Sequence, residues 1–250
     1  MLSKAGWLGA TAAVGAPLGA TPGAAASPEV PAAKRKLKLV VTGGHPGDPE
    51  YGCGGTIAHY TNAGHEVVLL YLNRGDPAET TSREAGGGRV AEARKACEIL
   101  KARPAYAGQI DGKSVVDPAH YEQFRHILEA ELPNAVFTHW PIDNHADHRA
   151  ISTLVHEAWL RMKKSFALYY YEVSNGEDTV QFAPTHYVDI TETEPRKRLA
   201  CYAHASQNPA RFYGLQETVT RWRGIESGHK QAEAYIRHIQ SPDFTLPKAS

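Results

Sequence analysis

The feature that most restricts the fold of this chain is a nearly continuous apolar run, "HEVVLLYLNRG", from His65 to Gly75. A strand that faces water on one side alternates apolar and polar residues, so an unbroken run indicates a strand buried on both faces. Helices cover both faces when they connect parallel strands. The run therefore predicts a sheet that lies between two layers of helices.

Strand-like and helix-like segments alternate along the rest of the chain. Further strands are expected at 37–41, 105–112, 134–141, 166–174 and 186–191. Amphipathic periodicity and capping signals predict helices at 48–64, 89–102, 119–132, 147–164, 194–206 and 217–239. This alternation predicts one three-layer α/β domain with a mainly parallel sheet, over residues 36–250.

Composition argues against several classes of protein. The content of 42% hydrophobic and 22% charged residues is that of a soluble globular domain. The net charge of zero provides no field that would favour nucleic acid or an anionic membrane. Cys53, Cys97 and Cys201 show no C-x-x-C spacing, so we expect buried, inert thiols rather than a disulfide framework or a thiolate zinc site.

Residues 1–30 have the layout of an export signal, with one early Lys, then small and apolar residues, and then "GAAAS". The segment is too weakly apolar for a stable membrane span, which needs roughly 20 apolar residues. A disordered Ala/Gly tail is the alternative. We expect an exported protein, periplasmic or extracellular. "MLSKAGWLGA" also resembles the part of a twin-arginine signal that follows the arginine pair, which leads to the hypothesis that the true start codon lies a few codons upstream.

Two polar loops follow predicted strands, where parallel sheets place their functional loops. "GGHPGDPE" carries His45 and Asp48, and "HWPIDNHADHRA" carries His145, Asp147 and His148. Zinc hydrolases take three ligands from His and carboxylate side chains and leave one position for water. Two strand-end loops of one parallel sheet can converge on a single ion.

Each loop alone has a simpler explanation. His45 and Asp48 suit turn hydrogen bonds, and Asp147 suits a helix N-cap. The combination, at two equivalent positions of the sheet, favours a metal site. A phosphate-binding loop is disfavoured because the first loop has neither G-x-G-x-x-G nor G-K-[ST], and because Asp48 and Glu50 would repel a phosphate.

The two loops resemble the paired motifs of the PIG-L/LmbE-like deacetylase family. "HPGDPEYGCGG" is similar to its His-Pro-Asp-Asp-x-Glu motif, and "HADH" to its His-x-Asp-His motif. The resemblance spans about residues 36–210, including "AHASQ" late in the chain. It implies a Rossmann-like fold and a zinc-dependent hydrolase that removes acetyl groups from N-acetylglucosamine-type substrates by metal-activated water.

Carried over by position, the resemblance makes His45, Asp48 and His148 the ligands of zinc or another divalent metal. It makes His145 the group that protonates the leaving amine or steadies the oxyanion. Asp147 would orient a histidine from behind.

One position departs from the family pattern, because the usual general base, the first Asp after His-Pro, is Gly47 here. Asp143 or Glu50 could replace it, and Asp143 is the candidate that we include among the catalytic residues. A second possibility is that His145 and the metal act without a carboxylate base. Another is that the chain is a non-catalytic, metal-containing carbohydrate-binding protein. A nucleotide-binding domain is a third hypothesis. The leading expectation is an amide hydrolase acting on an amino sugar or glycoconjugate.

Overall fold

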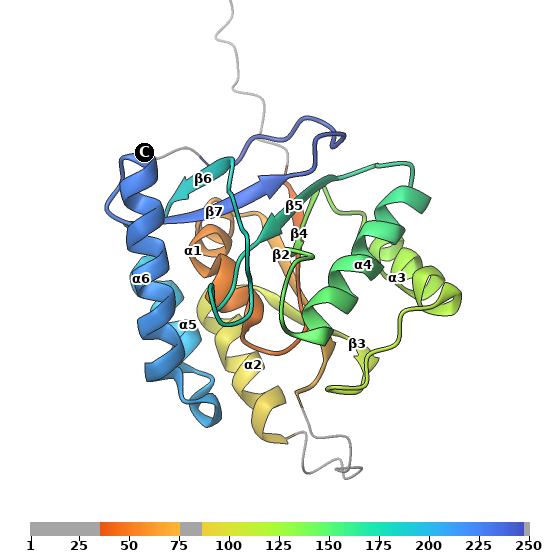
Figure 1. The fold of residues 1–250 in the computed structure, drawn as a ribbon, viewed down its shortest axis with the longest axis horizontal. Coiled ribbons are helices and arrows are strands. Elements are labelled where there is room, and N and C mark those ends of the chain that lie inside the picture. The colour runs from red at the N-terminus through yellow and green to blue at the C-terminus, as the bar shows by residue number, and fades with distance from the viewer. Residues whose placement is uncertain (1–35, 76–86, 248–250) are drawn as a thin grey trace, which may run out of the picture. The chain divides into compact units, whose positions relative to one another are not determined.

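A computed structural model describes residues 36–75 and 87–247 of the chain (Figure 1). The predicted export signal, residues 1–30, lies outside the described residues. Within the described ranges, no helix combines the length and the apolar character needed to cross a membrane.

The described strands form one sheet in the order β3-β2-β1-β4-β5-β7-β6. Their bounds are β1 (Lys38–Gly43), β2 (Glu66–Asn73), β3 (Arg103–Gln109), β4 (Ala135–His139), β5 (Ala167–Tyr171), β6 (His186–Asp189) and β7 (Ala232–Arg237). The helices are α1 (Asp48–Asn62), α2 (Gly87–Leu100), α3 (Pro118–Glu131), α4 (Ala146–Arg161), α5 (Glu194–Tyr202) and α6 (Pro209–Ser227), with a short 3-10 turn η1 (Ala205–Gln207).

The sheet is mainly parallel, as predicted. Strand β1 pairs in parallel with β2 and β4, while β2–β3 and β4–β5 are also parallel. Only β7 runs the other way among the described strands, antiparallel to both β5 and β6. The order 3-2-1-4-5 is that of a Rossmann-like sheet, in which ligands bind where the winding reverses, between β1 and β4.

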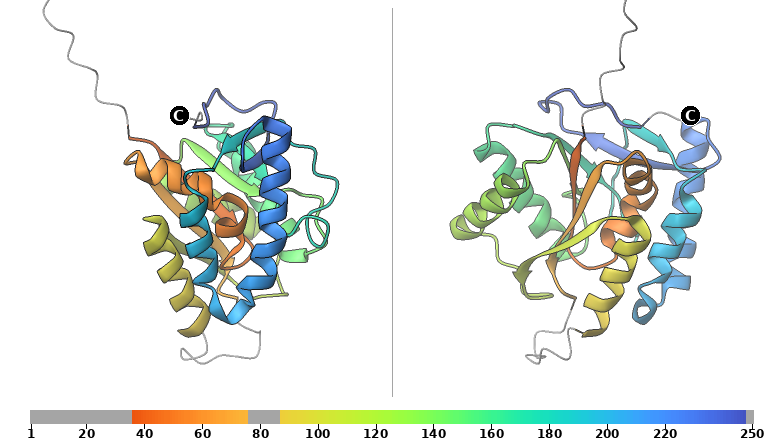
Figure 2. Two further views of the ribbon diagram at one scale, coloured as in Figure 1. Left: turned by 90° about the vertical axis from the view of Figure 1, so that its left-hand side faces the viewer. Right: turned by 180° about the vertical axis from the view of Figure 1, so that it is seen from behind.

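Helices cover both faces of the sheet, with α1, α2, α5 and α6 on one side and α3 and α4 on the other (Figures 1 and 2). Alternate side chains of β2 consequently enter two different cores, with Val67, Leu69 and Tyr71 in one and Val68, Leu70 and Leu72 in the other. The apolar run is therefore buried on both faces, as predicted. All three cysteines are free and lie in the first core, where burial raises their pKa and keeps the thiols inert.

The expected helix at 217–239 is wrong in its second half. Helix α6 ends at Ser227, and Gly228 closes it in a left-handed conformation at φ 79°. The chain then turns back as strand β7, where Tyr235 pairs with both Tyr171 of β5 and His186 of β6. A sequence window does not contain these distant partners, so the local helical pattern is misleading.

Candidate metal centre

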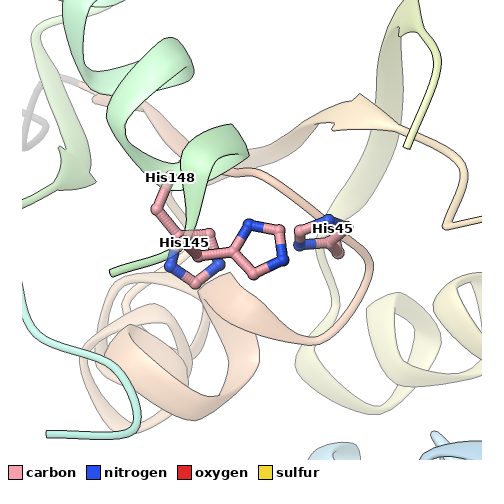
Figure 3. A group of neighbouring side chains, drawn as sticks. All are labelled: His45, His145 and His148. Atoms are coloured by element: carbon pink, nitrogen blue, oxygen red, sulfur yellow. The ribbon is translucent and has the colours of Figure 1, made fainter. Parts of the chain in front are cut away.

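The two polar loops meet at the carboxyl ends of β1 and β4. The β1–α1 loop carries His45 and leads to Asp48 at the start of α1, and His148 lies in the first turn of α4 (Figure 3). Asp48 Oδ2 lies 3.4 Å from His45 Nδ1 and 3.3 Å from His148 Nε2. The three predicted ligands are therefore adjacent, although about a hundred residues separate the two loops in the chain.

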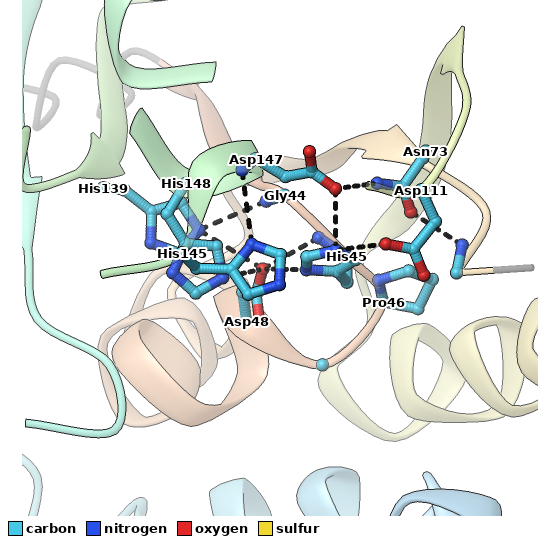
Figure 4. Close-up of polar contacts among 12 residues, drawn as sticks. Gly44, His45, Pro46, Asp48, Asn73, Asp111, His139, His145, Asp147 and His148 are labelled. Carbon is cyan, nitrogen blue, oxygen red and sulfur yellow. Dashed lines mark hydrogen bonds and ion pairs between the residues drawn. The ribbon is translucent and has the colours of Figure 1, made fainter. Parts of the chain in front are cut away.

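His45 is held from behind by carboxylates. Its Nε2 lies 3.1 Å from Asp147 Oδ2 and 3.0 Å from Asp111 Oδ1, which leaves Nδ1 facing Asp48 (Figure 4). Burial alone would lower the pKa of His45, but Asp111, Asp147 and Asp48 outweigh it and raise the pKa well above its usual value. The side chain of Asp147 is buried and also accepts hydrogen bonds from Asn73 Nδ2, Gly112 N and Ser114 Oγ. This is the contact that an orienting role requires, and the role itself stays a prediction.

His148 is held in the same way by a different carboxylate. Its Nδ1 lies 3.1 Å from Asp143 Oδ1, while Nε2 faces Asp48. Burial disfavours a charged ring, yet the carboxylates of Asp48 and Asp143 raise the pKa of His148 to about 9. Burial would raise the pKa of Asp48, but His148, His139 and His45 hold it well below its usual value. The cluster therefore has strong affinity for positive charge, whether protons or a metal ion.

His145 occupies a different chemical position. It is the N-cap of α4, the place that the sequence suggests for Asp147, and its Nδ1 accepts the backbone N–H of Asp147 at 3.2 Å. Burial, with the nearby His148 and His45, lowers the pKa of His145. The neutral ring therefore carries its proton on Nε2, as a hydrogen-bond donor.

His139, the last residue of β4, belongs to the cluster although the motifs do not predict it. Its ring stacks on that of His148 with centroids 3.9 Å apart, and its Nε2 lies 3.3 Å from Asp48 Oδ2. The Gly44 N–H is 3.2 Å from the same nitrogen. Burial and the neighbouring His148 lower the pKa of His139 to about 4, so the ring is neutral. Its position at the end of a central strand is the only signal that the sequence offers.

The predicted set His45/Asp48/His148 is not itself a group with all donor atoms within 4.8 Å of one another, but parts of it have the spacing of metal ligands. With bonds of about 2.0–2.1 Å, neighbouring ligands of a tetrahedral zinc lie about 3.4 Å apart. The distances from Asp48 to His45 and His148 have this length. Donor atoms within 4.8 Å of one another form three overlapping groups, namely His45/His145/His148, Asp48/His139/His148 and His45/Asp111/Asp147. The structure thus contains a His/Asp cluster able to hold a metal ion.

A cavity of about 250 Å³ opens onto the cluster. Its lining includes His45, Asp48, His145 and His148 on one side. Arg89, Asp111, Asp178, His204, Gln207 and Phe212 contribute further parts of the wall. The volume is below the roughly 300–1,000 Å³ of drug-sized sites, so the cavity suits one small group rather than an entire extended ligand.

Comparison with known proteins agrees with this geometry. The sequence model of the PIG-L family, described as GlcNAc-PI de-N-acetylase, matches residues 40–159, a range that contains both motifs. The diacetylchitobiose deacetylase of Thermococcus kodakarensis is 29% identical over 217 residues, covering 78% of this chain and 80% of the relative. The chain is therefore similar to PIG-L-type deacetylases over the range that contains both motifs.

Solved structures share the α/β fold of this chain. A conserved protein of Thermus thermophilus, TT1542, superposes with a TM-score of 0.72 at 26% identity, covering 85% of this chain and 100% of that one. GalB, the 4-carboxy-2-hydroxymuconate hydratase from Pseudomonas putida, has the same TM-score and coverage at 21% identity. A hydratase shares this fold, so the reaction has to be argued from the site.

Gly47 marks the departure from the PIG-L/LmbE-like pattern in the structure as well. It is the N-cap of α1, at φ 115° and ψ −41°, and it lines the cavity. The two carboxylates considered as replacements lie elsewhere. Asp143 is behind His148, and Glu50 is buried, bonded to Tyr71 Oη, His204 Nε2 and the N–H of Gly47. Neither is part of the cavity lining. Their catalytic roles stay predictions.

Proposed function

We propose that this protein is a metal-dependent amide hydrolase that removes an acetyl group from an N-acetylglucosamine-type sugar or glycoconjugate. The observation that carries the proposal is the convergence of His45, Asp48 and His148 at the floor of a small cavity that His145 also lines. The kinship with a diacetylchitobiose deacetylase supports the substrate class.

In this proposal His45 Nδ1, Asp48 and His148 Nε2 hold the ion, for which zinc is our first choice. A bound divalent ion polarises an acyl oxygen and lowers the pKa of water. Asp147 and Asp143 would orient His45 and His148, because each contacts the ring nitrogen that faces away from Asp48. Such partners fix the ring and raise its basicity as a ligand.

His145 supplies a hydrogen bond to the reacting group. Because its Nδ1 accepts from the Asp147 backbone, its Nε2–H is available to the cavity. A neutral donor aimed at an amide oxygen stabilises the negative charge that develops as the carbonyl carbon becomes tetrahedral. Arg89 and Gln207 on the wall provide donors for sugar hydroxyl groups.

The alternative is a metal-containing carbohydrate-binding protein without turnover. The observation that favours it is Gly47, which provides no carboxylate where the family usually has one. Loss of a general base lowers a rate by roughly 10²–10⁴.

One experiment separates the two functions. Purified protein is given N,N'-diacetylchitobiose and longer chitooligosaccharides, with zinc and after chelation, while acetate and free amine are measured. We expect acetate and amine in equal amounts, lost on chelation and restored by zinc. Binding of sugar without release of acetate would support the binding protein instead, and absence of both would refute both functions.

We also propose that residues 1–30 direct export, which rests on their sequence alone. Sequencing the N-terminus of the native protein from the periplasm or medium tests this. Recovery of uncleaved Met1 from the cytoplasm would contradict it.

A further inference from the structure

The cavity needs a carboxylate that Gly47 does not provide. Three carboxylates line it among the described residues, namely Asp48, Asp111 and Asp178. Each can be judged by what already occupies its oxygen atoms.

The carboxylates of Asp48 and Asp111 already contact histidine ring nitrogens. Asp48 Oδ2 lies among His45, His139 and His148 and accepts the backbone N–H of His45 at 2.8 Å. Asp111 Oδ1 contacts His45 Nε2, the nitrogen opposite the one that faces Asp48, and its Oδ2 is 3.9 Å from Arg89. Asp111 therefore lies behind His45 as seen from Asp48.

Asp143 and Glu50 also have their carboxylate oxygens occupied by hydrogen bonds. Asp143 accepts from His145 N and Thr179 Oγ1 in addition to its contact with His148. Both oxygens of Glu50 are bonded, and the side chain is fully buried. Neither carboxylate lines the cavity.

Asp178 differs from Asp143 and Glu50 because it lines the cavity. It lies on the loop after β5, which is tied to the segment that enters the His145–His148 motif. The Asn144 N–H donates to Asp178 O at 2.8 Å, and Thr179 forms an isolated β-bridge with Asp143. The loop is therefore fixed against the segment that carries His145 and His148, and Asp178 lines the same cavity as His45, Asp48 and His148.

The surroundings of Asp178 suit a proton acceptor. Partial burial raises the pKa of Asp178. The nearby His148 lowers this pKa, and the carboxylates of Asp143 and Asp48 raise it further. Ser174, like His148, acts to lower this pKa, and the net shift is upward. A base is most effective when its pKa lies nearer the working pH than that of an ordinary carboxylate.

We propose that Asp178 is the general base of the hydrolysis, in place of the missing carboxylate at Gly47. The inference rests on the proposed function. Asp178 takes one proton from water as the water oxygen bonds to the acetyl carbon. The carbon–nitrogen bond then breaks as Asp178 returns this proton to the leaving nitrogen, so that acetic acid, which ionises to acetate, and the free amino sugar result.

Asp178→Asn tests the role, with Glu177→Gln as the matched control. Glu177 is the adjacent carboxylate, is half-exposed, pairs with Arg211 and does not line the cavity. We expect Asp178→Asn to lower kcat by about 10²–10⁴-fold, with zinc content and thermal midpoint unchanged. Glu177→Gln should stay within about twofold of wild type, because no proton transfer depends on it. Asp178→Ala should regain part of its rate with added formate, which can enter the space and accept the proton.

A binding measurement gives a readout that does not depend on turnover. Acetate, the product, carries the same charge as the Asp178 carboxylate, so Asp178→Asn should bind acetate about three- to tenfold more tightly by calorimetry, whereas Glu177→Gln should not. Wild-type activity together with an active Asp178→Asn variant would overturn the inference and leave the proposed function intact. Loss of zinc from Asp178→Asn would also overturn it, because the residue would then support the metal. An inactive wild type would refute both.

Discussion

At the scale of single residues, the site depends on which nitrogen each histidine turns toward Asp48. His45 presents Nδ1 because Asp147 and Asp111 engage Nε2, and His148 presents Nε2 because Asp143 engages Nδ1. The order of residues in "HPGD" and "HADH" predicts the ligand types. It does not predict their ring orientation, because the orienting carboxylates come from separate loops.

His148→Ala should abolish metal binding, because it removes a ligand from the centre of the cluster. Asp143→Asn should weaken zinc binding by about 10–100-fold, because it removes the negative partner behind His148 while the ligand remains. Metal titration with a competing chelator measures both. Glu129→Gln, on the exposed surface of α3, should bind zinc as the wild type does. One zinc per chain in His148→Ala would refute the ligand assignment.

Gly47→Asp would introduce the residue that PIG-L/LmbE-like deacetylases usually have here, but it should destabilise the protein. The glycine has φ 115°, which an L-residue adopts only with strain of about 1–3 kcal/mol. Space is not the obstacle, because the nearest atoms to an added Cβ, in the Tyr51 ring, are 3.6 Å away. Urea unfolding should therefore show the same loss for Gly47→Ala. If only Gly47→Asp lowered the free energy of unfolding, the cause would be the added negative charge and not backbone strain.

At the scale of elements, helix α1 lies unusually close to its neighbours because its packed face consists of glycines. A Cβ on Gly55 would lie 2.4 Å from Ile190, and one on Gly52 would lie 2.3 Å from the Tyr171 ring. The sequence "EYGCGGT" therefore suits close packing in a helix that has poor intrinsic propensity. This packing positions Asp48 at the N-terminus of α1.

Gly55→Ala and Gly214→Ala should have opposite effects on stability. Both residues lie in helices, but nothing lies within 4 Å of a Cβ placed on Gly214. Overpacking at Gly55 should cost about 1–3 kcal/mol, whereas alanine at Gly214 should stabilise the protein by up to about 1 kcal/mol. Denaturant unfolding measures both. Equal stabilisation by the two variants would mean that α1 can move away from Ile190 without cost.

At the scale of the whole molecule, a buried ion pair joins three elements. Lys197 Nζ of α5 lies 2.6 Å from Glu233 Oε1 of β7, and both side chains are 1% exposed. Glu233 also accepts the backbone N–H groups of Gly55 and Thr56 within α1. This contact ties the antiparallel end of the sheet to the helix that carries Asp48.

Lys197→Met should cost about 3–5 kcal/mol of folding free energy, because it leaves the Glu233 carboxylate buried without its counter-ion. Adding Glu233→Gln should recover part of the loss, since the amide oxygen still accepts an N–H and carries no charge. A double-mutant cycle by urea unfolding measures this. A Lys197→Met variant as stable as the wild type would show that Lys197 does not neutralise Glu233.

The sequence by itself determined the layered α/β class and the parallel core strands, because these depend on periodicity and on neighbours within a few residues. The ligand types in the two motifs stay predictions of the sequence. Only the tertiary structure decided that 232–237 is a strand, because its partners are β5 and β6. It likewise brought His139 and Asp178 to the site and placed Asp143 behind His148. Such placements come from contacts between segments far apart in the chain, which no local pattern encodes.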